Sequence, residues 1–221
     1  MSSGPGVSLP ETLGAISREI AADSPLFAED LTATPGDGVG AGYSELFTVA
    51  AGDCGAVRAN RYRFALEYIF EGYLLHYGSS RLLRSGRRDF RLLAGDYMYA
   101  RGLDRMAALE DIFCIKMLSR LIEFCSFVHC EGLEPRLALD AWSVVTLCLA
   151  GHARGGCDSS WRDGFESCRR ALWEGDPERA SLSGLRDLML ADIDPGRHKK
   201  TGVILTNIYA DLHQERRPDG D

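Results

Sequence analysis

Hydrophobic residues recur at helical spacing along most of this 221-residue chain. From residue 8 onward apolar side chains stand three or four positions apart, which places them on one face of an α-helix. No segment alternates apolar and polar residues as a half-buried strand does. Groups of glycine, proline, serine and aspartate separate the periodic segments and indicate turns. The pattern predicts helices over residues 8–23, 45–51, 56–76, 90–109, 111–130, 136–152, 160–174, 181–191 and 200–214.

These elements predict an all-α protein folded as a single helical bundle. The expected bundle comprises residues 8–214, and we expect 1–7 and 215–221 to be flexible tails. A chain of this length suits one domain. At about 1.5 Å per residue, the segment 111–130 would be about 30 Å long, the full height of a bundle.

Composition narrows the classes of function. A net charge of −7 argues against a nucleic-acid-binding protein that relies on bulk positive charge. No apolar run reaches the roughly 18 residues that a membrane span needs, so no integral membrane segment is expected. The first residues, MSSGPGVSLPE, lack the basic and apolar regions of a signal peptide. With seven widely spaced cysteines, we expect a cytoplasmic protein whose thiols are reduced.

Two groupings approach a metal-binding pattern without completing it. Cys125 and His129 share a helix face at four-residue spacing, but no fourth ligand is evident nearby. Glu67 and Glu71 share a face in the same way, yet the second Glu-x-x-His helix of a carboxylate-bridged site is missing. We therefore expect no metal site in this chain.

Arginines are concentrated between the second and third long helices, in an otherwise acidic protein. Guanidinium groups match phosphate oxygens, so metal-free capture of a diphosphate is one hypothesis for this cluster. The other is a solvated connector that contacts acidic groups on a partner. The candidate diphosphate-binding residues are Arg81, Arg84, Arg87 and Arg88.

Three segments, in order, resemble the trans-polyprenyl diphosphate synthase family. Residues 91–133 (RLLAGDYMYARGLDRMAALEDIFCIKMLSRLIEFCSFVHCEGL) resemble the family's VLAGDYLLARA helix and the long helix after it. Residues 66–86 (LEYIFEGYLLHYGSSRLLRSG) resemble its ElIHtaSLIHDDimD…RRG segment. Residues 38–52 (GVGAGYSELFTVAAG) take the position of its GKRLRPLLvlla segment. The resemblance covers more than a third of the chain and implies a bundle of the isoprenoid-synthase type.

The resemblance fails where the family holds its substrates. In catalytic members the first Asp-rich motif, DDxxD, gathers the Mg²⁺ ions that hold the allylic diphosphate. The positions that align with it here are Tyr77, Gly78 and Arg81. A lysine and two arginines of the family, which clamp the second diphosphate, align with Val39, Gly40 and Gly42. Two sets of aspartates lie in the half of the chain that would hold the second motif, but neither has its spacing; they are Asp158 and Asp163, or Asp187, Asp192 and Asp194.

This combination resembles one branch of the family, the small non-catalytic subunit (component I) of heterodimeric heptaprenyl or hexaprenyl diphosphate synthases. Residues 111–119 (DIFCIKMLS) resemble the start of a helix in those subunits. The resemblance implies an accessory subunit that supports or regulates isopentenyl chain elongation by a DDxxD-bearing partner, in a heterodimer or heterotetramer. Mg²⁺ is expected on the partner and prenyl diphosphates in the complex, with no cofactor and no catalytic residue in this chain. The expected interface or tunnel-wall residues are Leu92, Tyr97, Tyr99, Met106, Ile115 and Phe124.

Two alternatives stay open. The first is a stand-alone, divergent prenyltransferase or terpene synthase that uses the arginine cluster and the scattered aspartates. The second is a protein that binds a prenyl diphosphate without turning it over. Mg²⁺-dependent turnover by the isolated chain favours the first, and saturable binding without turnover favours the second.

Overall fold

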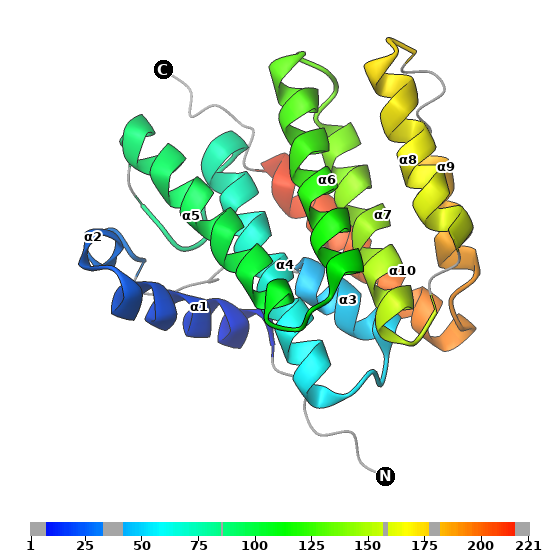
Figure 1. Ribbon diagram of the computed structural model, residues 1–221, viewed down its shortest axis with the longest axis horizontal. Coiled ribbons are helices and arrows are strands. Elements are labelled where there is room, and N and C mark those ends of the chain that lie inside the picture. Colours follow the sequence, from blue (N-terminus) through cyan, green and yellow to red (C-terminus); the bar gives the residue numbers. More distant parts are fainter. Residues whose placement is uncertain (1–7, 33–41, 85, 157–158, 177–181, 215–221) are drawn as a thin grey trace.

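The computed structural model describes residues 8–32, 42–84, 86–156, 159–176 and 182–214. Within these ranges the regular elements are all α-helices (Figure 1), which confirms the predicted all-α class. The helices are α1 (Leu9–Asp23), α2 (Pro25–Ala28), α3 (Tyr43–Ala51), α4 (Ala56–Tyr77), α5 (Arg88–Ala107), α6 (Ile112–Cys130), α7 (Arg136–Ala153), α8 (Ser159–Trp173), α9 (Leu182–Ala191) and α10 (Pro195–Gln214). In Figure 1, α1 and α2 lie at one side, α8 and α9 at the other, and α10 passes behind α6 and α7.

Polar caps set where two of the helices begin. Ser8 forms a capping box with Glu11: its side-chain oxygen accepts from the Glu11 N–H, and the Glu11 carboxylate accepts from the Ser8 N–H at 2.7 Å. Asp111 caps α6 by accepting a hydrogen bond from the Cys114 N–H at 3.0 Å. Both caps satisfy backbone donors that a helix start otherwise leaves unpaired.

α4 is the central helix. Every residue from Tyr62 to Leu75 is buried, so the helix is enclosed on all sides. One side joins a core with α3, α6, α7 and the C-terminal helices, represented by Leu66, Trp142 and Phe165. The other side joins a smaller core with α1, α2 and α5, which includes Tyr68. The rest of the chain therefore packs around α4.

α4 and α5 approach closely because glycines lie between them. A Cβ atom on Gly102 would clash with Ile69 and would lie 3.0 Å from the Ala65 carbonyl oxygen. A Cβ atom on Gly72 would lie 2.9 Å from the carbonyl oxygen of Gly95. Larger residues at these positions would push the two helices apart.

The connector between α4 and α5 is tied to the segment after α2. Leu31 and Leu83 form an isolated antiparallel bridge. The Thr32 N–H donates to the Leu82 carbonyl at 2.8 Å, which adds to this link. The start of α5 is therefore held against the N-terminal helices as well as against α4.

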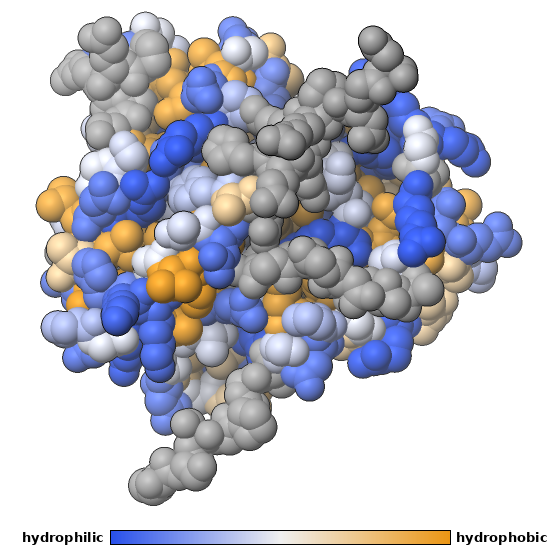
Figure 2. All heavy atoms as spheres, turned by 180° about the vertical axis from the view of Figure 1, so that it is seen from behind, coloured by the Kyte–Doolittle hydropathy of each residue, from blue (hydrophilic) through white to orange (hydrophobic). Residues whose placement is uncertain are grey.

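The molecular surface is mixed in polarity. Figure 2 views the side opposite to that facing the reader in Figure 1, and apolar residues form separate groups among hydrophilic ones there. Of the described helices, none combines the length and the apolarity needed to cross a membrane.

Candidate functional site

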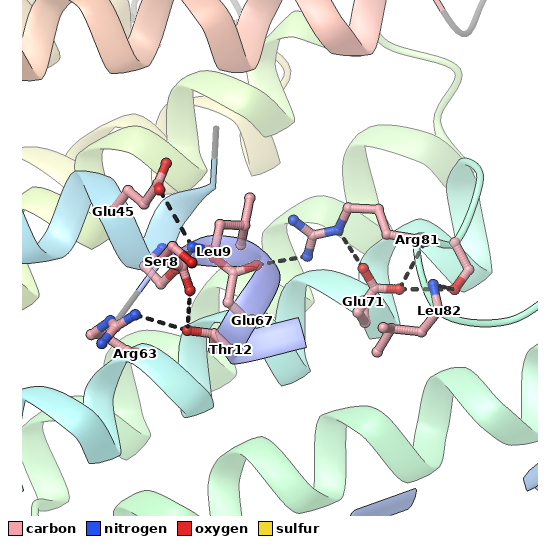
Figure 3. A network of polar contacts seen from close by, with 11 residues as sticks. Ser8, Leu9, Thr12, Glu45, Arg63, Glu67, Glu71, Arg81 and Leu82 are labelled. Atoms are coloured by element: carbon pink, nitrogen blue, oxygen red, sulfur yellow. Dashed lines mark hydrogen bonds and ion pairs between the residues drawn. The ribbon is translucent and has the colours of Figure 1, made fainter. Parts of the chain in front are cut away.

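Two fully buried glutamates on α4 meet one arginine from the connector that follows it (Figure 3). Glu67 and Glu71 are four residues apart, so they share a face of the helix. Arg81 turns back over that face with a side chain only 6% exposed. Its Nη2 atom lies 2.6 Å from Glu67 Oε2, and its Nε atom donates to Glu71 Oε1. We call Glu67, Glu71 and Arg81 the buried charge cluster.

Each carboxylate oxygen of the cluster accepts a hydrogen bond. Besides the guanidinium contacts, Glu67 Oε1 accepts from the Ser44 N–H at 2.8 Å. Glu71 Oε2 accepts from the Ser80 hydroxyl at 2.8 Å and from the Arg81 N–H at 3.2 Å. Gly42 makes room for this arrangement, since a Cβ atom there would lie 2.6 Å from Glu67 Oε1. These hydrogen bonds link α3, α4 and the connector, while the buried Nη1 atom of Arg81 makes none to the described residues.

Arg81 keeps its charge inside the protein. Burial opposes the charged guanidinium, but Glu67 and Glu71 outweigh that effect and raise the pKa of Arg81. The guanidinium also lies 5.0 Å from the centre of the Phe70 ring, a cation–π contact. Arg63, one turn before Glu67, adds a second cation nearby and donates to the Thr12 hydroxyl at 2.8 Å. The three members of the cluster carry one net negative charge, which the neighbouring Arg63 offsets in part.

A second group of side chains, the aromatic–histidine cluster, lies where α4 ends beside α5 and α6. Tyr77 stacks on His129 with ring centres 4.1 Å apart, and its hydroxyl donates to Ser126 Oγ at 3.1 Å. The Tyr73 hydroxyl lies 3.1 Å from His129 Nε2. Tyr99, from α5, belongs to the same group and stacks on His76. These contacts fill the space beside the end of α4 with packed rings.

His76 has an acidic neighbour, and its side chain is largely buried. Its Nε2 atom lies 3.3 Å from Asp96 Oδ1, outside hydrogen-bond geometry. Burial lowers the pKa of His76, and Asp96 offsets only part of that effect. The ring is therefore held toward its neutral form.

The structure does not bring the four candidate diphosphate-binding arginines together. Arg81 lies inside the protein, whereas Arg84, Arg87 and Arg88 are exposed. The Arg84 guanidinium donates to the Thr32 hydroxyl at 2.9 Å. Arg87 forms an exposed ion pair with the aspartate two residues later. Any shared diphosphate site on this connector would have to rely on the last three arginines.

The six expected interface or tunnel-wall residues lie at different depths. Leu92 is 45% exposed, and Tyr97, Tyr99 and Ile115 are partly buried. Tyr97 is engaged within the chain, since its hydroxyl donates to Asp23 Oδ2 of α1 at 2.9 Å. Met106 and Phe124 are fully buried in the core around α4 and α6, so neither reaches an outer surface.

The other residues that the sequence comparison singled out for substrate binding are only partly described. Val39, Gly40 and Asp158 lie outside the described residues. Asp163 pairs with Arg162 at 2.8 Å on the exposed face of α8. Across the described ranges, no three His, Cys, Asp or Glu side chains are grouped as a metal ion would require.

Sequence reasoning overlooked the buried charge cluster as an ion pair. Buried carboxylates are almost always paired, so two glutamates on one face of a strongly apolar helix are a usable signal for a nearby cation. In its described parts the protein is therefore all-helical, and its buried charge cluster lies against the central helix, α4. No family model, no curated protein and no solved structure matches the chain.

Proposed function

We propose that this chain is a non-catalytic accessory subunit of a heterodimeric trans-polyprenyl diphosphate synthase, which supports chain elongation by a DDxxD-bearing partner. The observation that carries the proposal is the buried charge cluster. Arg81 pairs with both Glu67 and Glu71 within the chain, at the region that the resemblance aligns with the first Asp-rich motif. Because these side chains bind one another and stabilise the fold, the cluster needs neither Mg²⁺ nor a diphosphate.

The other two aligned positions support the same conclusion. Tyr77 is engaged by its ring and its hydroxyl in the aromatic–histidine cluster. The Gly78 carbonyl oxygen accepts a hydrogen bond from the Arg91 guanidinium, which reaches back from α5. All three aligned positions are therefore committed to contacts inside the chain.

An accessory subunit also needs a surface for its partner. The outer side of α5 offers Leu92 and its neighbour Leu93, which are 45% and 53% exposed. Burying such residues against a partner stabilises both chains, because whatever binds only the folded state shifts the equilibrium toward it. The partner would supply Mg²⁺, the diphosphate-binding groups and the condensation chemistry.

The test is capture of the partner from the native host by the tagged full-length chain, with mass spectrometry of the co-purified proteins. We expect a DDxxD-bearing prenyl synthase at a one-to-one ratio. Leu92→Glu should abolish capture, because it places a charge in the proposed interface. Val203→Glu is the matched control: Val203 is 55% exposed on α10, and its replacement should leave capture unchanged.

Two results would overturn the proposal. One is Mg²⁺-dependent turnover of an allylic diphosphate by the purified chain alone, which would make it a stand-alone enzyme. The other is recovery of the tagged chain from the native host without any DDxxD-bearing prenyl synthase. Capture that Leu92→Glu and Val203→Glu reduce equally would remove only α5 as the interface.

A further inference from the structure

A groove of about 600 Å³ lies between the first half of α6 and α8. It is separate from the aromatic–histidine cluster, which contacts the second half of α6. The volume falls within the range of about 300–1,000 Å³ that is typical of small-molecule sites. Its lining residues are Ile112, Phe113, Lys116, Met117, Arg120, Arg162, Asp163, Glu166 and Arg170.

Contacts between α6 and α8 hold the walls of this groove in place. Arg120 of α6 forms an ion pair with Glu166 of α8. Two turns further along, Phe127 stacks on Trp173 with ring centres 4.1 Å apart. Because these contacts follow the same order on both helices, α6 and α8 run in parallel along the groove.

The groove carries unbalanced positive charge. Its four cationic and two acidic side chains give a net charge of +2, in a chain whose net charge is −7. Glu166 is already paired with Arg120, and Asp163 is paired with Arg162. Lys116 and Arg170 are exposed, and within the described part of the chain neither forms an ion pair. Two cations, one on each wall, are thus available for an anion.

The floor of the groove is apolar. Met117 is buried beneath it, and Phe113 is fixed by stacking on His152 with ring centres 4.3 Å apart. Ile112 is 58% exposed at the rim. A ligand that satisfies both the cations and this apolar surface needs a charged head and an apolar chain.

We propose that this groove binds a phosphate monoester of an apolar chain, with Lys116 and Arg170 as the cations for its head group. A phosphate monoester carries a charge of about −1.5 to −2 at neutral pH, which matches the two available cations. The apolar chain lies over Phe113, Met117 and Ile112. This site is distinct from the proposed partner surface on α5 and does not depend on the accessory-subunit proposal.

Isothermal titration calorimetry of the full chain with octyl phosphate tests the site. We expect one saturable site whose affinity for octyl phosphate exceeds that for inorganic phosphate or octanol at least tenfold. The double variant Lys116→Gln/Arg170→Gln should lower the affinity at least tenfold. The matched control Lys199→Gln/Lys200→Gln removes two exposed cations from α10 and should change it less than twofold.

Replacing one apolar residue of the groove distinguishes the contribution of the ligand's apolar chain from that of its head group. Ile112→Gln should weaken octyl phosphate binding severalfold and leave the weak binding of inorganic phosphate unchanged. Circular dichroism should show that every variant is folded, since all the replaced side chains are exposed.

Four outcomes would overturn the assignment. Equal losses in the two double variants would indicate general charge attraction. Full binding by the groove variant, combined with a loss in Arg84→Gln/Arg88→Gln, would place the site on the connector. Octanol binding as tightly as octyl phosphate would mean that the cations play no part, and inorganic phosphate binding as tightly would mean that the apolar floor plays none.

Discussion

Replacing Arg81 with methionine tests how the buried charge cluster stabilises the fold. The substitution keeps an unbranched stem but removes the guanidinium group, which leaves two buried carboxylates without their cation. Breaking a buried ion pair in this way costs about 3–5 kcal/mol. Because whole domains are stable by only about 5–15 kcal/mol, Arg81→Met should remove a large part of the stability.

The free energy of unfolding, measured by urea denaturation and circular dichroism, provides the assay. For a chain of this size each kcal/mol lowers the melting temperature by about 2–4 °C, so we expect a drop of about 6–20 °C. Arg120→Met is the matched control, since it breaks an ion pair whose arginine side chain is 40% exposed. Partly exposed pairs contribute at most about 1 kcal/mol, so this control should lose far less stability.

A third variant distinguishes two causes of the lost stability, the unpaired buried charges and the loss of side-chain packing. Glu67→Gln and Glu71→Gln, combined with Arg81→Met, remove all three charges and retain side-chain oxygens that can accept from Ser44 and Ser80. Replacing an entire buried ion pair is often nearly neutral, so the triple variant should recover at least half of the loss. Two results would refute this reasoning: an Arg81→Met loss no larger than that of the control, or a triple variant less stable than Arg81→Met.

Three further predictions concern other parts of the fold. Gly102→Ala should destabilise the protein by about 1–3 kcal/mol in urea unfolding, because its Cβ atom would clash with Ile69, whereas Gly202→Ala, with open space around it, should stabilise by about 0.5–1 kcal/mol. Burial lowers the pKa of His76, so the unfolded chain binds a proton at this residue more readily than the folded chain does. The contribution of His76 to the free energy of unfolding is therefore complete above the ordinary pKa of histidine, and it is lost as the pH falls through the lowered pKa of the folded protein. His76→Gln should therefore flatten the fall in unfolding free energy on acidification, and an unchanged slope would contradict this account. Among the described cysteines only Cys130 is exposed, so a thiol reagent should label it before the others in native protein, as peptide mapping would show.

Hydrophobic periodicity predicted where the long helices lie, because apolar residues that become buried recur at helical spacing through them. The predicted helix over 111–130 corresponds to α6, and that over 136–152 corresponds to α7. The short helix α2 was not predicted, since four residues cannot establish a period. α10 begins at Pro195 rather than at residue 200, because proline suits the first turn of a helix and Asp194 accepts a hydrogen bond from the Gly196 N–H at 3.0 Å.

The buried charge cluster was harder to predict than the helices. The four-residue spacing of Glu67 and Glu71 is visible in the sequence, but the identity of their cation is not. Four arginines follow α4, and the path of the connector decides that Arg81 alone turns inward. That path depends on long-range contacts, such as the bridge between Leu31 and Leu83, which local patterns do not encode.

The two proposals place their functions on different surfaces, and their variants can be exchanged to test this separation. Leu92 lies on α5, whereas Lys116 and Arg170 line the groove between α6 and α8. Replacements at distant sites without shared partners act independently. Leu92→Glu should therefore leave the affinity for octyl phosphate unchanged, and Lys116→Gln/Arg170→Gln should leave capture of the partner unchanged. If the groove variant also loses the partner, the two surfaces act as one, and the anion would then control assembly.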